Sequence, residues 1–159
     1  MARRIFFLTA LITLGLVLSC PDRYASAEEK EMLDDADVAD MIKTAPSPEE
    51  MQGMSAVYLL NGEKDVVNSD GTGTYELHVV IKILDKQAIP LGEIRIPYNS
   101  DEATLEISLA RTILPDYSVV NVSKDNIKEM SPYSAFPLYS NIKLKQFAMP
   151  AMDVGNVIE

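Results

Sequence analysis

Few residues of this chain could start a chemical reaction. It has one cysteine, Cys20, and one histidine, His78. A serine or cysteine nucleophile needs a nearby base such as histidine, and no G-x-S-x-G motif is present to expose a serine. Cys20 lies in or beside an N-terminal segment that we expect to be cleaved off, so the mature chain would have no thiol. We therefore interpret His78 as a structural residue on a strand and predict no catalytic residue.

Metal and cofactor sites are also not indicated. One Cys and one His are too few for a usual zinc site. The acidic run Asp34-Asp35-x-Asp37-x-x-Asp40 lacks the central Gly and the terminal Glu of a calcium loop, which favours a solvated helix face. No predicted helix follows Gly71-Thr72-Gly73, as a phosphate loop would require. The 24 acidic residues form many pairs, and the sequence singles out none for catalysis.

The composition is that of one globular domain that does not bind nucleic acid. The 159 residues are 47% hydrophobic, which is enough for a core. Against 14 Lys and Arg stand 24 Asp and Glu, for a net charge of −10. Binding to phosphates requires clustered basic residues, and the sequence has no such cluster.

Residues 1–27 have the pattern of a secretory signal peptide. Arg3 and Arg4 form a basic start, and the run 5–18 (IFFLTALITLGLVL) has no charge. Its 14 residues are too few to span a membrane, which takes about 20, but they suit a signal. We predict export to the periplasm or cell envelope.

Two ways of processing this signal remain open. Ala25-Ser26-Ala27 is a small-x-small site, and cleavage after it would make Glu28 the first residue. Alternatively, Val17-Leu18-Ser19-Cys20 resembles a lipobox, with lipidation at Cys20. We favour cleavage after Ala27 because Leu18 is bulky for a lipobox.

A short acidic helix is predicted between about residues 28 and 43, within a lead-in and linker that spans 28–53. Its apolar residues recur at intervals of three and four, and Pro46 and Pro48 end it. These apolar residues are Met32, Leu33, Ala36, Ala39 and Ile42.

From residue 54 onward the apolar pattern has period two, which predicts strands. The clearest strand places one apolar set on a single face, and we expect this face to point into the core: Tyr75, Leu77, Val79, Ile81 and Ile83. Pro97 is expected to end a strand that begins at Leu91. Residues 123–141 are predicted to be a surface loop with one helical turn near 124–130. The further predicted strands are 56–61, 66–67, 105–113, 119–122, 142–149 and 154–158.

Many short strands with turns between them and a single helix indicate a mainly β fold. We predict an antiparallel β-sandwich-like domain over residues 54–159, preceded by the signal peptide and the short acidic helix.

Three blocks of the chain resemble, in order, a bacterial domain family known only as a domain of unknown function. They are AVYLLNGEKDVVNSDGTGTYELHVVIKIL (56–84), IPYNSDEATLEISLARTILPDYSVVNV (96–122) and SPYSAFPLYSNIKLKQFAMPAMDVGNVIE (131–159). Ala110 and Pro115-Asp116 keep the family's turn pattern, but Tyr117 stands where Gly is usual.

The resemblance implies a β-sandwich-like accessory domain that precedes a transglutaminase-like (cysteine peptidase-like) domain in exported proteins. It implies no catalytic residue here, because the Cys, His and Asp of that second domain have no counterpart in this chain. The resemblance also leads us to expect that this chain is truncated at its C-terminal end. Residues 154–159 would then be a strand cut short, with an unpaired apolar edge.

Two other hypotheses compete with this one. A free-standing envelope binding protein could hold a glycan or peptide through loop tyrosines such as Tyr133 and Tyr139. An enzyme that uses paired carboxylates ranks last.

The signal prediction can be tested on protein extracted from the cell envelope of the native host. N-terminal sequencing should show a chain that begins at Glu28. A blocked, lipid-bearing Cys20 would instead establish the lipobox alternative, and a full-length cytoplasmic protein would contradict both.

Overall fold

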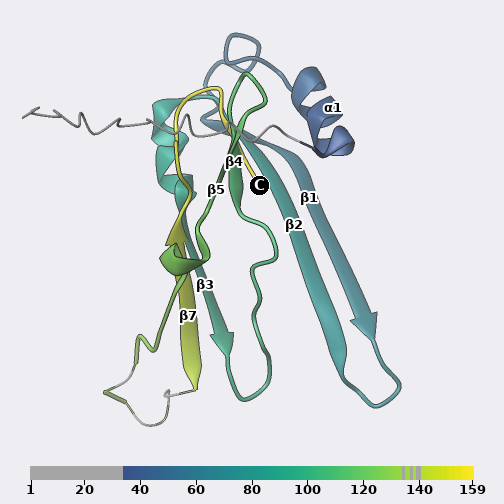
Figure 1. The fold of residues 1–159 in the computed structure, drawn as a ribbon, viewed down its shortest axis with the longest axis vertical. Coiled ribbons are helices and arrows are strands. Elements are labelled where there is room, and N and C mark those ends of the chain that lie inside the picture. Colours follow the sequence, from purple (N-terminus) through teal and green to yellow (C-terminus); the bar gives the residue numbers. More distant parts are fainter. Residues whose placement is uncertain (1–33, 134, 137, 139–140) are drawn as a thin grey trace, which may run out of the picture.

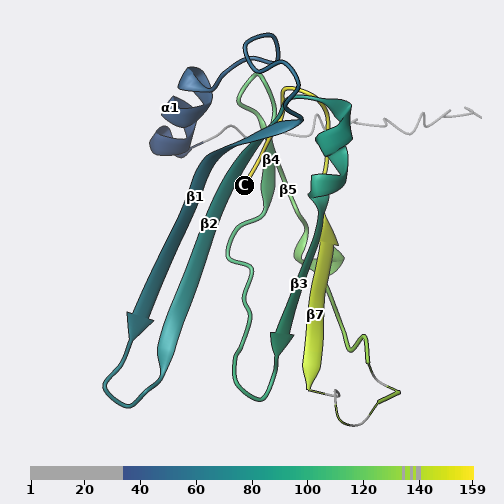
Figure 2. The ribbon, with the colours of Figure 1, turned by 180° about the vertical axis from the view of Figure 1, so that it is seen from behind.

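A computed structural model describes residues 34–133, 135–136, 138 and 141–159. The predicted signal, with Cys20, Ala25 and Ala27, therefore lies outside the described residues. Two antiparallel sheets pack face to face, and a short helix covers the outer face of the larger sheet (Figures 1 and 2). The mainly β, sandwich-like fold expected from the sequence is confirmed.

The larger sheet begins with a long hairpin. Strand β1 (Ala56–Val67) pairs with β2 (Gly73–Ile83) from end to end, with one register shift between Tyr58 and Leu60. In the turn, the Asp70 carboxylate accepts bonds from both the amide and the hydroxyl of Thr72, at 3.0 and 2.7 Å. The strands predicted at 56–61 and 66–67 are thus one strand, β1.

Three short strands complete this sheet, in the order β1-β2-β8-β4-β5. They are β8 (Val157–Ile158), β4 (Arg111–Ile113) and β5 (Val119–Asn121). The C-terminal strand β8 pairs with β2 on one side and with β4 on the other. The expected unpaired edge at the C-terminal strand is therefore wrong, because this strand lies inside the sheet.

The smaller sheet has the order β3-β7-β6. It consists of β3 (Glu93–Asn99), β7 (Ile142–Ala148) and β6 (Lys128–Met130). Pro97 does not end β3 as predicted, since it pairs with Leu144 inside the ladder. Proline is tolerated there because β3 is an edge strand, so the missing N–H can face away from β7.

Two 3₁₀ helices precede strands of the smaller sheet. Lys86–Gly92 takes up the first two residues of the predicted strand 91–96. Lys124–Asn126 is the helical turn expected near 124–130. Strand β6 follows it directly and was missed by the sequence analysis, which placed a loop there.

The main core lies between the two sheets. Ile81, Ile83 and Ile158 from the larger sheet pack with Phe147 and Met149 of the smaller one. Thr112 is fully buried on the same inner face, and its hydroxyl donates to the Pro150 carbonyl at 2.7 Å. The period-two pattern at the end of β2 therefore predicted its inward face correctly.

Helix α1 (Ala36–Thr44) covers the outer face of the larger sheet. It begins one residue after Asp35, whose carboxylate caps the amides of Asp37 and Val38. Residues 34 and 35 thus lie before the helix and not within it as predicted. Val38 is buried against a second cluster on this face, formed by Val80, Ile113, Val119 and Val157.

The outer half of the β1–β2 hairpin is not covered by the smaller sheet. Tyr75 and Leu77, expected in the core, are 60% and 55% exposed. Figures 1 and 2 show the reason, since β1–β2 and β3–β7 diverge towards their far ends. The predicted alternation of faces along β2 is correct, but only the part of β2 nearest β8 is covered by the smaller sheet.

The predicted strand 105–113 is also reduced, to β4 alone. After it, the predicted turn at residues 115–118 is present, closed by a bond from the Leu114 amide to the Ser118 carbonyl. Tyr117 adopts a φ of +63° in this turn. This left-handed conformation is one that glycine adopts without strain and that residues with a side chain adopt less readily.

None of the described helices is long and apolar enough to cross a membrane.

The boundary of the core on β2 can be tested with one substitution on each side of it. Ile81→Asp should abolish cooperative unfolding in urea, because an unpaired buried charge costs several kcal/mol, close to the whole stability of a small domain. Leu77→Asp lies on the same face but is exposed, so we expect a change within about 0.5 kcal/mol. Equal damage from both would contradict the proposed divergence of the sheets.

Candidate functional site

Four charged or titratable residues, distant in sequence, meet on the outer face of the larger sheet. The two oxygens of the Glu159 carboxylate contact His78 Nε2 at 2.8 Å and Arg111 Nε at 2.7 Å. Arg111 also donates from a terminal nitrogen to Asp34, at 3.1 Å. Glu159 therefore stands between a histidine of β2 and an arginine of β4. We call these four residues, Asp34, His78, Arg111 and Glu159, the outer cluster.

Strand register places the outer cluster. Arg111 and Glu159 exchange two backbone hydrogen bonds, so they lie directly opposite each other. The side chains of Arg111 and Glu159 lie on the same face of the sheet as Val80. His78 lies on this face too, because it is two residues before Val80 on β2. Asp34 comes from the segment just before α1, which covers this same face.

Burial makes the Arg111–Glu159 pair the centre of the cluster. The side chains of Glu159 and Arg111 are 1% and 9% exposed, whereas that of His78 is about half exposed and that of Asp34 is largely in solvent. Burial opposes the charge on Arg111, but hydrogen bonds to Glu159 and Asp34 outweigh it and raise its pKa. The bond from Arg111 also lowers the pKa of Asp34.

The electrostatic contribution of Asp34 depends on pH with a definite sign. Because its pKa is lower in the folded protein, its contact with Arg111 stabilises the fold above the unfolded value of about 3.9. This contribution disappears as the pH falls through the folded pKa. The solvent-exposed position of Asp34 keeps the effect small.

The outer cluster holds strands together and has no evident reactive group. The hydrogen-bond partner shown for the His78 ring is the Glu159 carboxylate. The sequence carries no local signal for the partner of His78, because Glu159 lies 81 residues further along the chain. The one available signal was Arg111, a charged residue next to the buried run Thr112-Ile113.

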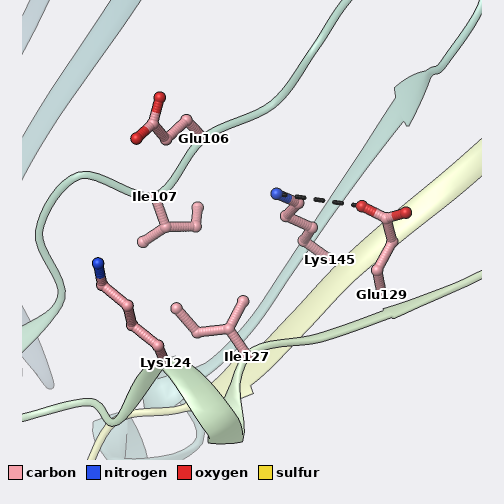
Figure 3. Close-up of a pocket in the computed structure, with 6 residues that line it drawn as sticks. All are labelled: Glu106, Ile107, Lys124, Ile127, Glu129 and Lys145. Atoms are coloured by element: carbon pink, nitrogen blue, oxygen red, sulfur yellow. Dashed lines mark ion pairs between the residues drawn. The ribbon is translucent and has the colours of Figure 1, made fainter.

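A shallow pocket of about 320 Å³ lies over the smaller sheet. Figure 3 shows Ile107 and Ile127 at its middle, with four charged residues around them. The ammonium of Lys145 lies 4.0 Å from the Glu129 carboxylate and donates to the Leu105 carbonyl. The remaining charged residues of the lining are Glu106 and Lys124.

Internal partners already occupy one side of this pocket. The Tyr98 hydroxyl donates to Glu129 at 2.6 Å, and this bond raises the pKa of Tyr98. The lining therefore leaves two isoleucines, the Glu106 carboxylate and the Lys124 amine for a ligand. This set would suit a peptide that places an apolar side chain between the isoleucines. The lining holds no nucleophile and base in contact.

The acidic run and the loop tyrosines considered from the sequence can be placed in part. Among the residues that the structure describes, no group of three or more His, Cys, Asp or Glu could hold a metal ion. Tyr133 is about half exposed, and Tyr139 lies outside the described residues.

The structural role of the outer cluster can be tested at Arg111. Arg111→Met would leave the buried Glu159 carboxylate without its cation, and we expect a loss of about 3–5 kcal/mol in the free energy of unfolding. Lys64→Met is the matched control, since the Lys64–Glu76 pair is exposed and should contribute less than about 1 kcal/mol. Adding Glu159→Gln to Arg111→Met should recover part of the loss in urea unfolding. A loss at Arg111 no larger than that at Lys64 would contradict this role.

The fold has a counterpart among solved structures. A protein described as a "putative protease" from Parabacteroides distasonis superposes with a TM-score of 0.60, at 24% identity over 65% of this chain. The chain spans only 21% of that protein's length. No curated protein matches the chain.

A family model matches residues 69–159, from the hairpin turn through β8. Its description is a domain of unknown function with a solved structure, DUF3857. The match covers more than half of the 159 residues. The chain therefore belongs to the DUF3857 domain family.

Proposed function

We propose that this chain is a non-catalytic accessory domain of an exported protein, which precedes a transglutaminase-like domain absent from this sequence. The observation that carries the proposal is the combined result of the comparisons. Residues 69–159 match the DUF3857 family, and the same fold forms about a fifth of a much longer protein described as a "putative protease". In such a protein, a chain of this kind would serve as one part of a larger assembly.

The geometry of the described residues supports a role outside catalysis. A cysteine or serine mechanism needs the nucleophile within hydrogen-bond reach of its base. Here the imidazole of His78 bonds to the Glu159 carboxylate, which Arg111 also holds. Both groups are thereby engaged in joining β2, β8 and β4.

A free-standing binding protein for a cell-envelope peptide or glycan is the second candidate. The pocket around Ile107 and Ile127 favours it, because apolar and charged groups border the same hollow. We rank it second because two charged residues of the lining, Glu129 and Lys145, are already paired with each other and with the domain itself.

The proposal predicts that activity requires the protein beyond this chain. The 159-residue chain and the whole product of its gene would be assayed for peptide hydrolysis and for incorporation of an amine into casein. We expect activity only in the whole product, and expect it to be lost when the cysteine of the transglutaminase-like domain is changed to Ala.

Two results would contradict this account. Activity of the 159-residue chain that falls with His78→Ala or Glu159→Gln would make it an enzyme. A gene that encodes no transglutaminase-like region would leave the binding-protein candidate in first place, and binding of cell-wall fragments would then be measured with Ile127→Asp as the negative control.

A further inference from the structure

Strand β2 is paired on both edges over only part of its length. Along β1 it is paired from Gly73 to Ile83. On its other edge, β8 pairs with Ile81 and Lys82 alone. In the described part of the chain, no strand pairs with this second edge over residues 73–80.

The direction of the backbone groups on this edge follows from strand alternation. Ile83 donates to the Asn156 carbonyl and accepts from the Gly155 amide, so its polar groups point away from β1. Every second residue of a strand has the same orientation. The amides and carbonyls of Tyr75, Leu77 and Val79 therefore point to the side on which β8 lies. We call this row the open edge of β2.

A second row of backbone groups lies on the far side of β8. Arg111 of β4 exchanges both of its backbone bonds with Glu159. Before Arg111, residues 104–109 make no hydrogen bond to another backbone group that the structure shows among the described residues, but the Leu105 carbonyl accepts from Lys145 of the smaller sheet. Because β2 and β4 flank the same strand, they are two strand spacings apart at β8, roughly 9–10 Å. At β8, one strand position therefore lies between β2 and β4.

Side chains along the open edge also lack cover. Tyr75 and Leu77 are more than half exposed on the face that Ile81 and Ile83 bury further along the same strand. An unpaired edge with exposed apolar residues is a surface that other strands readily join. On the neighbouring strand β1, Glu63 is opposite Leu77 and Asp65 is opposite Tyr75.

We infer that the open edge of β2 binds the polypeptide that follows Glu159 in the longer protein, as a strand that continues β8. This inference rests on the proposed function, in which the chain is one part of such a protein. The continuity with β8 identifies the occupant, because Ile158 and Glu159 already lie in this strand position, paired with Ile81 and Arg111. Main-chain hydrogen bonds would supply the attachment, as in other cases of strand addition to an open sheet edge.

The register fixes the chemistry of the incoming strand. Ile158 is opposite Ile81, so the first, third and fifth residues after Glu159 would be opposite Val79, Leu77 and Tyr75. Their side chains would share the inner face with Ile158, so we expect apolar residues at the first and third positions. The second residue would lie on the face of the outer cluster, opposite His78.

Residue-resolved hydrogen exchange on the chain that ends at Glu159 and on the longer protein tests the pairing. The amides of Tyr75, Leu77 and Val79 should exchange at least tenfold more slowly in the longer protein. The amides of Thr74, Glu76 and His78 already face β1 and should change little, which makes them the internal control. Unchanged exchange at the first three would overturn the inference.

Disulfide formation in the longer protein tests the register even if the shorter chain aggregates. With all other cysteines replaced by serine, His78→Cys should form a disulfide with a cysteine placed at the second residue after Glu159. Glu76→Cys is the matched control, two residues further along the same face, and should form little. Failure of the His78 pair, or equal yields from both pairs, would overturn the inference.

These results separate the inference from the proposed function. A closed edge in a longer protein without transglutaminase-like activity would support the strand and contradict the function. An open edge in a longer protein with transglutaminase-like activity would support the function and contradict the strand. A gene that ends at Glu159 would overturn the inference. So would amide exchange along the open edge that slows with rising concentration of the 159-residue chain alone, because this would indicate pairing between two copies.

Discussion

The arrangement of this domain depends on the two residues of β8. Val157 and Ile158 form the strand that joins the long hairpin β1–β2 to the short pair β4–β5. Ile158 is buried with the inner core and Val157 with the outer one. A strand of this length contributes few hydrogen bonds, but it is buried on both faces and paired on both edges, so its removal would open both cores at once.

The outer cluster extends this join by one residue. Glu159 continues β8 with two backbone bonds to Arg111, and its carboxylate then bonds to the side chains of both flanking strands. A buried ion pair gains little net free energy over an apolar pair, but breaking it is costly. The position of Glu159 suits a residue that fixes the register of β2, β8 and β4 relative to one another. The same placement starts the strand that we infer to continue along β2, so the cluster and the open edge belong to one feature.

Local pattern predicted the elements better than their partners. Period-two alternation identified β2, because this pattern depends on residues close in sequence. The exposure of Tyr75 and Leu77 depends on how far the smaller sheet reaches, and the tolerance of Pro97 depends on β3 being an edge. The outer cluster joins residues 34, 78, 111 and 159. These long-range contacts and the central position of β8 leave no pattern in neighbouring residues of the sequence.

The dependence on β8 is tested most directly by urea unfolding of a chain that ends at Asn156, compared with the 159-residue chain. Tryptophan is absent, so far-ultraviolet circular dichroism and tyrosine fluorescence would follow the transition. We expect the shortened chain to lose its single cooperative transition, because β2 and β4 would no longer be joined. A cooperative transition with an unchanged midpoint would show that the two halves of the sheet hold together without β8 and would contradict the account.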